Sequence, residues 1–439
     1  MNRPITSLSD RDRKHIWHPF TQEFTAPPPI AIRSGHGSTL IDDHGHHYLD
    51  LISSWWVNLH GHSHPQIAEA IYAQARSLEH VIFAGFTHEP AVELSEQICE
   101  SLPAGLERVF FTDNGSGSVE VALKMAFQHW RNQGQQRSRF LCFHDGYHGD
   151  TFGAMAVGNT SGFFDPFAEL LFEVDSVECP TTWLADPDVE AKEAAALVYL
   201  DHYLERHADD LAALIIEPLV QGAGGMKMYR PVFLQQVVER IQSAGSLVIF
   251  DEVMTGFGRT GRLFACHQIE AVPDIICLSK GLTGGFLPMA LTICSEGIYE
   301  SFLDESFNKA LIHSHSYTAN PLACAAALAS LKLTLAPACG KAMVRIEQQH
   351  RAGLERLACL PQVARARLCG TIAAFDLNVE TQGYHSRIGP WLKQRFLDQG
   401  LLIRPLGNVV YLMPPYCTRE DQLDQAWSAV FDIALEIPN

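Results

Sequence analysis

Two residues with reactive side chains each follow an apolar run as long as a β-strand. Lys280 follows residues 275–278, and Asp251 follows residues 247–250, 29 positions earlier. Such runs are typical of parallel strands covered on both faces, and ligands of open α/β sheets bind at the carboxyl ends of the strands. We therefore expect an amine and a carboxylate to converge there. For Lys280 alone, the plainer interpretation is a solvated residue leaving the sheet.

This pair of side chains matches the needs of pyridoxal phosphate. A lysine must bond covalently to the aldehyde of the cofactor, and a carboxylate must keep the pyridine nitrogen protonated so that the ring can accept electrons. A carboxylate beside a cationic ring is also favoured in its charged form. The sequence therefore predicts pyridoxal 5′-phosphate as cofactor, with Lys280 and Asp251 as catalytic residues.

Two further segments supply groups that such a cofactor requires. Residues 113–118 (Asp-Asn-Gly-Ser-Gly-Ser) precede a helical pattern that begins near Val119, so that backbone amides and a helix dipole are free to bind phosphate. Capping of this helix by Ser116 or Ser118 is the plainer interpretation, and both can hold. Tyr147 lies between glycines after another apolar run, where its ring is suited either to stacking on the cofactor or to packing.

Three further motifs carry less weight. Residues 256–261 fit G-x-G-x-x-G, yet no clear helix opens at the third glycine, as a dinucleotide fingerprint requires. The 21 histidines come without H-E-x-x-H or paired cysteines, so we expect no metal site. Residues 222–225 contain three glycines and favour a flexible turn over a phosphate cradle.

The elements that must position these residues alternate along the chain. Helical patterns occupy residues 119–130 and 232–241, between apolar runs, and the alternation predicts an α/β fold with a largely parallel sheet. The apolar runs expected to form strands are residues 109–112, 140–143, 214–216, 247–250 and 275–278.

A smaller α+β domain is expected after about residue 337. It should contain a helix over 342–357, short strands near 372–377 and 402–411, and a last helix from Glu420. We expect the N-terminal segment to complete it. The predicted domains are thus a large domain, residues 65–330, and a small discontinuous domain, residues 1–64 and 331–439.

Composition limits the classes of partner. The net charge of −18 repels nucleic acid and anionic lipid, and the longest apolar runs fall far short of a membrane span. The N-terminal residues lack the apolar centre of a secretory signal, and eleven scattered cysteines suggest reduced thiols. We expect a cytoplasmic protein that acts on small molecules, with neither nucleic acid nor membrane as partner.

The chain resembles the class III pyridoxal-phosphate aminotransferases along nearly its whole length. The resemblance rests on Glu217, residues 251–253 with 255–261, and residues 279–281. It implies the fold type I architecture: a large domain with a mostly parallel seven-stranded sheet, a small discontinuous domain, and a homodimer with shared active sites.

Finer motifs resemble the members of this family that act in biotin synthesis. These motifs are residues 15–19, 53–56, 146–151, 320–327, 404–405 and 411–416. The resemblance implies transfer of the amino group of S-adenosylmethionine to 8-amino-7-oxononanoate, giving 7,8-diaminononanoate. The implied cofactor-binding residues are Gly115, Ser116, Tyr147, Glu217, Asp251, Lys280, His315 and Ser316, of which His315 and Ser316 come from the partner subunit; Tyr147 stacks on the ring and counts as catalytic.

The implied substrate-binding residues also suit the acceptor, a long keto acid with an apolar middle. Trp55 and Trp56 supply an apolar wall, and the guanidinium of Arg404 binds the distant carboxylate. The full implied set is Phe20, Trp55, Trp56, Tyr147, Lys280, Ser314, Arg404 and Tyr411.

Two positions depart from the family pattern and bear on the amino donor. Phe20 stands where relatives often have tyrosine, and His315-Ser316 stands where they often have Pro-Thr. Because Phe20 lacks a hydroxyl that contacts substrate, lysine is an alternative donor. The sequence also leaves open a different class III ω-amino acid aminotransferase, a nicotinamide-dependent dehydrogenase, and a cofactor-bearing protein without catalysis.

Overall fold

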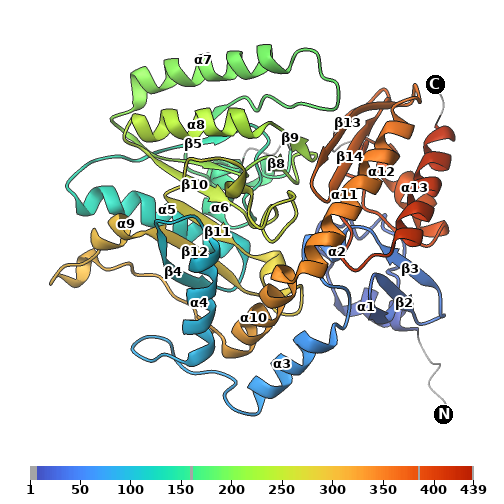
Figure 1. Ribbon diagram of the computed structural model, residues 1–439, viewed down its shortest axis with the longest axis horizontal. Helices are drawn as coiled ribbons and strands as arrows, with labels where there is room; N and C mark the ends of the chain where they lie inside the picture. Colours follow the sequence, from blue (N-terminus) through green and yellow to red (C-terminus); the bar gives the residue numbers. More distant parts are fainter. Residues whose placement is uncertain (1–6, 159–161, 384–385, 438–439) are drawn as a thin grey trace.

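The computed structural model describes residues 7–158, 162–383 and 386–437. At its centre the described residues form a seven-stranded sheet in the order β4-β12-β11-β10-β7-β5-β6, in which β12 alone is antiparallel to its neighbours (Figure 1). The strands are β4 (Leu106–Thr112), β12 (Ala290–Ser295), β11 (Ile275–Leu278), β10 (Leu247–Asp251), β7 (Leu211–Ile216), β5 (Arg139–Phe143) and β6 (Asp175–Val177). The predicted α/β class and mostly parallel sheet are confirmed.

The apolar runs identified all of these strands except β12 and β6. In β12 the buried Thr292 interrupts the apolar run, and its Oγ1 donates a hydrogen bond of 2.8 Å to the Ser118 carbonyl. A threonine with such a partner is stable inside a sheet, but it weakens the apolar signal in the sequence. β6 is three residues long, too short for any pattern to stand out.

Alternate residues of the central strands pack against helices on opposite faces of the sheet. In β10, Ile249 belongs to the core beneath α5 (Gly115–Asn132), whereas Phe250 belongs to the core that contains α8 (Pro231–Ser243). This alternation explains why the strands are apolar throughout, since neither face meets water. The other helices of this part are α3 (Pro65–Ala75), α4 (Glu89–Ser101), α6 (Phe152–Val157), α7 (Val189–His207), α9 (Glu296–Glu300) and α10 (Pro321–Leu335).

The C-terminal part is a separate α+β layer, as expected. Its sheet has the order β13-β14-β16, all antiparallel. The sequence missed β13, placed the start of α11 five residues late, and merged β15 with β16. The elements are α11 (Pro337–Leu357), β13 (Val363–Cys369), β14 (Ile372–Leu377), α12 (Ile388–Asp398), β15 (Leu401–Leu402), β16 (Val409–Leu412) and α13 (Glu420–Leu435).

The N-terminal segment joins this C-terminal part. β15 pairs in parallel with β3, so that one small sheet, in the order β1-β2-β3-β15, combines both ends of the chain. This pairing agrees with a discontinuous small domain, while the boundaries at residues 64 and 331 remain a prediction. The remaining N-terminal elements are α1 (Leu8–His15), β1 (Ile32–His36), β2 (Thr39–Asp42), β3 (His47–Asp50) and α2 (Ser53–Trp56).

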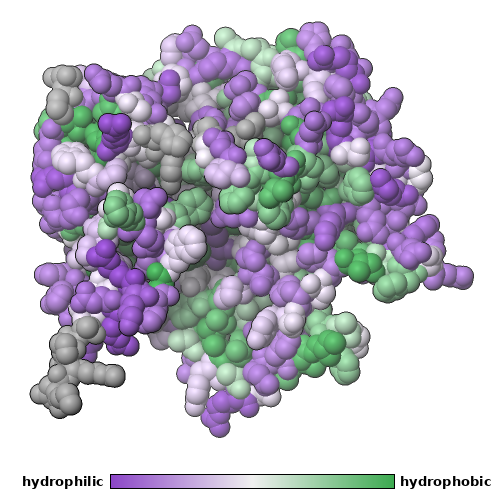
Figure 2. All heavy atoms as spheres, turned by 180° about the vertical axis from the view of Figure 1, so that it is seen from behind, coloured by the Kyte–Doolittle hydropathy of each residue, from purple (hydrophilic) through white to green (hydrophobic). Residues whose placement is uncertain are grey.

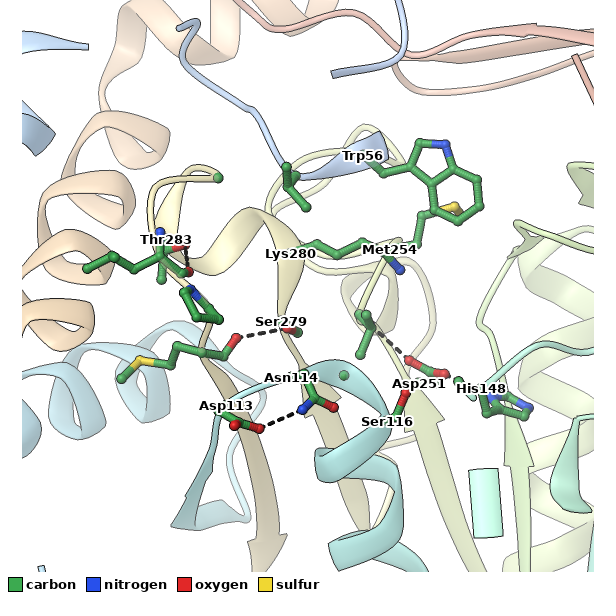
Figure 3. A pocket seen from close by; sticks show the side chains of 18 of the residues that line it. Trp56, Asp113, Asn114, Ser116, His148, Asp251, Met254, Ser279, Lys280 and Thr283 are labelled. Carbon is green, nitrogen blue, oxygen red and sulfur yellow. Dashed lines mark hydrogen bonds and ion pairs between the residues drawn. The ribbon is translucent and has the colours of Figure 1, made fainter. Parts of the chain in front are cut away.

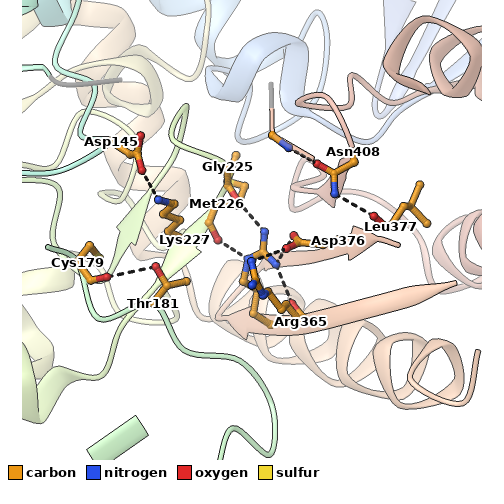
Figure 4. A network of polar contacts seen from close by, with 12 residues as sticks. Asp145, Cys179, Thr181, Gly225, Met226, Lys227, Arg365, Asp376, Leu377 and Asn408 are labelled. Atoms are coloured by element: carbon orange, nitrogen blue, oxygen red, sulfur yellow. Dashed lines mark hydrogen bonds and ion pairs between the residues drawn. The ribbon is translucent and has the colours of Figure 1, made fainter. Parts of the chain in front are cut away.

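Two buried arginines connect small-domain elements to loops of the large domain. In β13, the Arg367 guanidinium donates to the carbonyls of Gly225 (2.6 Å) and Met226 (2.7 Å) and to the Asp376 carboxylate (2.8 Å), within the network of Figure 4. Arg259 donates to the carbonyls of Asn58 (3.2 Å) and Pro414 (2.9 Å). Both side chains are almost fully buried.

Arg259 belongs to the glycine motif at residues 256–261. The motif forms turns with no helix at its third glycine, as the sequence indicated, and it carries Arg259 into the interior. A dinucleotide site is thereby excluded at this motif, because the helix N-terminus that would bind the pyrophosphate is missing there. Among the described helices, no single one is long and apolar enough to cross a membrane; only the pair α10 and α11, bent by 67°, passes on length and composition alone.

Candidate active site

The carboxyl ends of β4, β5, β7, β10 and β11 surround a pocket of about 400 Å³. In Figure 3, Lys280 extends into this pocket toward the space between Trp56 and Asp251. The predicted residues that line it are Trp56, Gly115, Ser116, Tyr147, Glu217, Asp251 and Lys280. The amine and the carboxylate expected at neighbouring strand ends therefore lie in one pocket.

Lys280 is the second residue after β11 and lines the pocket. Its backbone has a φ of +42°, in the left-handed region that side chains disfavour, and Nζ lies 5.0 Å from the centre of the Trp56 ring. Burial lowers the pKa of Lys280, while the charges of Asp251 and Glu217 partly oppose this shift. A lysine with a lowered pKa is more readily deprotonated and thus more nucleophilic.

Asp251, the last residue of β10, is fixed by two donors. His148 Nδ1 donates to its Oδ2 at 2.7 Å, and the Val253 amide donates to its Oδ1 at 3.1 Å. Both side chains of the Asp251–His148 pair are buried. Sequence reasoning missed His148, because the two residues are 103 positions apart and only the fold brings them together. Its position beside Tyr147 was the one available signal.

Glu217, at the end of β7, bonds to the backbone of two loops. Its Oε1 accepts a hydrogen bond from the Tyr147 amide at 2.9 Å, and its Oε2 accepts one from the Gly222 amide at 2.8 Å. Burial and the nearby charge of Asp251 raise its pKa to about 7, against the opposing effects of His148 and the two amides. Glu217 thus fixes the loop that carries Tyr147, and residues 222–225 form the predicted turn.

The start of α5 supplies the glycine- and serine-rich end of the pocket. The sequence suggested Ser116 or Ser118 as cap, but the cap is Asn114, whose side chain accepts from the Gly117 amide at 2.8 Å. Ser116 Oγ instead accepts from the Asp150 amide at 3.2 Å. At Gly115 a Cβ would lie 2.8 Å from a Val253 methyl carbon, so glycine is required for this close approach. Free amides at a helix N-terminus bind anions, so this end of the pocket is suited to one.

Tyr147 is held on one side by another aromatic residue. Its ring stacks with that of Phe164, with centroids 6.2 Å apart and planes at 19°. Burial raises the pKa of its hydroxyl, so the side chain stays neutral. A neutral, fixed ring that lines the pocket is suited to stacking against a flat ligand.

The expected substrate residues lie partly outside the pocket lining. Trp56 lines it, and its Nε1 donates to the Tyr411 hydroxyl at 3.0 Å. Trp55 lies next to it in the chain, 4.1 Å from the Arg404 guanidinium and 5.8 Å from the Phe20 ring. Consecutive tryptophans therefore contact Lys280 on one side and Arg404 on the other, although neither Trp55 nor Arg404 lines the same cavity.

The segment expected to serve a partner subunit lies at the surface. Ser314 and Ser316 are exposed, and His315 Nδ1 lies 4.0 Å from the Asp113 carboxylate. His315 Nε2 is buried without a hydrogen bond. Within this single chain none of the three lines the pocket described above. Among the described residues no group of three or more histidine, cysteine or acidic side chains is placed to hold a metal ion.

Comparison of the sequence with known proteins finds aminotransferases that match nearly the whole chain. The chain is 55% identical over 96% of its length, and 99% of the relative, to adenosylmethionine-8-amino-7-oxononanoate aminotransferase of Synechococcus elongatus. It is 41% identical over 95% of both chains to the protein of the same name from Geobacter sulfurreducens.

Solved structures agree as well. The crystal structure of adenosylmethionine-8-amino-7-oxononanoate aminotransferase from Methanocaldococcus jannaschii matches with a TM-score of 0.90 and 33% identity, over 98% of this chain and 99% of that one. An omega transaminase from Pseudomonas jessenii in complex with PMP matches with a TM-score of 0.89 and 28% identity, over 98% of both chains. The family described as Aminotransferase class-III matches residues 21–434, so the chain belongs to the class III aminotransferases, which use pyridoxal 5′-phosphate.

Proposed function

We propose that this chain aminates 8-amino-7-oxononanoate to 7,8-diaminononanoate in biotin synthesis, with S-adenosylmethionine as the amino donor. The observation that carries this proposal is the near full-length likeness to the Synechococcus elongatus aminotransferase. The contacts of Trp56 with Lys280 and of Trp55 with Arg404 support it, because a long acceptor needs an amine at one end and a cation at the other.

The residues of the pocket fit pyridoxal 5′-phosphate. Gly115 and Ser116, at the start of α5, are suited to its phosphate, Asp251 to its pyridine nitrogen, Tyr147 to its ring, and Lys280 to its aldehyde. When bound, the cofactor would supply a ring that accepts the electrons of the substrate carbanion and an aldehyde group that carries the amino group between the two substrates. Glu217 acts indirectly by fixing the Tyr147 loop.

The protein side chains then bind, orient and move protons. Lys280 Nζ, whose pKa burial lowers, takes a proton from the substrate carbon and returns it. The Asp251 carboxylate stays oriented through His148 and the Val253 amide. Trp55 and Trp56 exclude water from the acceptor chain, and Arg404 binds its carboxylate by a bidentate contact.

We propose that two subunits share their active sites. Large apolar side chains such as Ile82, Phe86, Phe307 and Tyr317 are exposed in one chain, and Figure 2 shows several apolar patches on the face turned to the viewer. Exposed apolar surface of this kind marks association sites. In the dimer, Ser314, His315 and Ser316 extend to the neighbouring site, with Ser316 at the phosphate. All eleven cysteines are free thiols, which fits a reducing compartment such as the cytoplasm.

A direct assay tests the substrates. The purified chain, loaded with pyridoxal phosphate, receives the keto acid with S-adenosylmethionine, with lysine, or with neither, and 7,8-diaminononanoate is measured by mass spectrometry. We expect product with S-adenosylmethionine. Product that forms with lysine but not with S-adenosylmethionine would overturn the proposed donor. If the cofactor is bound and no product forms with either donor, the proposed acceptor would be wrong.

A further inference from the structure

The segment that carries both tryptophans has an uncommon backbone. Ser53, Ser54, Trp55 and Trp56 all have positive φ, from 45° to 75°, and none of them is glycine. In this left-handed conformation each Cβ crowds the following carbonyl oxygen, so L-residues rarely adopt it in succession. Such a run persists only where the surrounding structure holds it, and such strain concentrates at functional sites. We call residues 53–56 the left-handed turn.

A single carboxylate holds the start of this turn. Asp50 is completely buried, and its Oδ1 accepts hydrogen bonds of 3.1 Å from the amides of both Ile52 and Ser54. Its Oδ2 accepts from Ser54 Oγ at 2.9 Å and contacts His62 Nε2 at 3.0 Å. Four donors on one buried carboxylate fix the direction in which the chain leaves β3.

The neighbours of His62 determine which of its nitrogens carries the proton. Asn58 Oδ1 accepts from the Gly61 amide at 2.7 Å, which orients the Asn58 side-chain amide. Asn58 Nδ2 must then donate to His62 Nδ1, 3.2 Å away. In the neutral ring the proton is therefore on Nε2, which donates to Asp50. The Asp50 carboxylate thus accepts all four hydrogen bonds, including the one from His62.

Both ends of the left-handed turn are tied to the C-terminal part of the chain. Ser53 Oγ donates to the Met413 carbonyl at 2.8 Å, and Trp56 Nε1 donates to the Tyr411 hydroxyl at 3.0 Å. The turn is therefore held on both sides by buried hydrogen bonds. Loosening one side changes the direction of the two indole rings without removing either of them.

The turn places two consecutive tryptophans against two different cations. Trp56 lies over the Lys280 amine, 5.0 Å from Nζ to the ring centre, and Trp55 lies over the Arg404 guanidinium at 4.1 Å. In a strand, neighbouring side chains would point to opposite faces of the backbone. In the left-handed turn one ring contacts the amine and the next contacts the guanidinium, so the direction of the turn sets how these two cations lie relative to one another.

We propose that Asp50 is a positioning residue that sets the chain length of the acceptor by holding the left-handed turn. The inference rests on the proposed function, in which Arg404 binds the carboxylate and the ketone lies near Lys280. The direction of the turn then sets how far the Trp55–Arg404 pair lies from the Lys280 amine, and this separation selects the number of methylene groups in the acceptor. Asp50 contacts neither substrate nor cofactor in this role.

The substitution Asp50→Asn tests the proposal. Because two backbone amides fix the amide oxygen at the Oδ1 position, the new NH₂ group faces Ser54 Oγ and the His62 N–H. The Ser54 hydroxyl can turn and accept from this NH₂ group, but the His62 N–H loses its acceptor. We expect the KM and the calorimetric Kd of the acceptor to rise about tenfold, as loss of a charged hydrogen bond typically produces. The kcat, the donor KM and the absorbance of the bound cofactor should change little.

Asp42→Asn is the matched control. Asp42 is a buried carboxylate of the same small sheet, and it binds the amides of His44 and His46, the His46 ring and the Tyr48 hydroxyl, away from the pocket. It should lower stability without changing the acceptor KM. If both variants raised the acceptor KM equally, or if Asp50→Asn raised both substrate KM values alike, the role of Asp50 would be merely structural.

Acceptor analogues give a second readout. In the wild type, removing one methylene group should weaken the acceptor about fourfold or more, and in Asp50→Asn this preference should shrink. An unchanged preference would overturn the proposal. Failure of the wild type to aminate the keto acid at all would instead refute the proposed function.

Two substitutions at Ser54 keep the proposal testable if Asp50→Asn does not fold. Both Ser54→Ala and Ser54→Gly remove the hydroxyl that binds Asp50, but only glycine adopts positive φ without cost. We expect Ser54→Ala to raise the acceptor KM several-fold and Ser54→Gly to stay closer to the wild type. An acceptor KM that is the same in both variants would show that the left-handed backbone does not matter.

Discussion

At the scale of the single residue, the chemistry depends on an amine that burial has made more easily deprotonated. Lys280→Ala should leave a folded chain that no longer bonds covalently to pyridoxal phosphate, because only a primary amine attacks the aldehyde. Turnover should fall to background. Borohydride reduction followed by peptide mass spectrometry measures the bond, and Lys280→Arg, which keeps the charge, should fail equally. A reducible lysine elsewhere with unimpaired turnover would refute the assignment.

A second prediction at this scale concerns the carboxylate of Asp251. Asp251→Asn should keep part of the cofactor binding but lose more than about a hundredfold in kcat, since a neutral amide no longer compensates the pyridinium charge. Glu252→Gln is the matched control, because this neighbouring buried carboxylate binds the amides of Ala265 and Cys266 instead of facing the pocket. Steady-state kinetics should separate the two, and wild-type kcat in Asp251→Asn would remove Asp251 from its role.

At the scale of the element, Glu217 joins two loops through one carboxylate. Its pKa is about 7 in the folded chain, above the ordinary value of 4.5. Between these pH values the folded chain holds a proton that the unfolded chain has lost, so the free energy of unfolding falls as the pH rises through this window. For a shift of this size the fall is at most about 3 kcal/mol.

Glu217→Gln, which does not titrate, should therefore lack this part of the pH dependence. Urea unfolding of the cofactor-free wild type and variant, at several pH values between about 4.5 and 7.5, measures it. The wild type should lose stability relative to the variant as the pH rises. Equal pH slopes would mean that Glu217 is already ionised throughout the window.

The strands were predictable and their cross-connections were not. Apolar runs place Lys280 and Asp251 at neighbouring strand ends, because a strand covered on both faces must be apolar throughout. The Asp251–His148 pair joins residues distant in sequence, and no local pattern encodes such a contact. The left-handed turn is equally hidden, because Ser-Ser-Trp-Trp contains no glycine and its conformation depends on Asp50 and Met413.

At the scale of the whole molecule, the shared site makes a prediction about mixed dimers. Subunits with Lys280→Ala are exchanged with subunits that carry Ser316→Ala. In a symmetric dimer with composite sites, one site of each mixed dimer receives both defects and the other receives neither. Activity should therefore recover partly above either parent, given that Ser316→Ala is itself impaired. Absence of recovery after verified exchange would indicate sites built within one chain.

The two arginines that join the parts of the chain have a consequence for tolerance to salt. Arg259 bonds to backbone carbonyls in the interior, whereas pairs such as Arg108–Glu296 lie half exposed. Dissolved ions screen exposed charges but do not enter the interior, so about 1 M salt, with a Debye length of about 3 Å, should weaken the surface pairs alone. Scanning calorimetry should then show one unfolding transition at low and at high ionic strength, and a second transition that appears only in salt would contradict this. A chain joined in this way can keep its two parts aligned in brine as well as in dilute buffer.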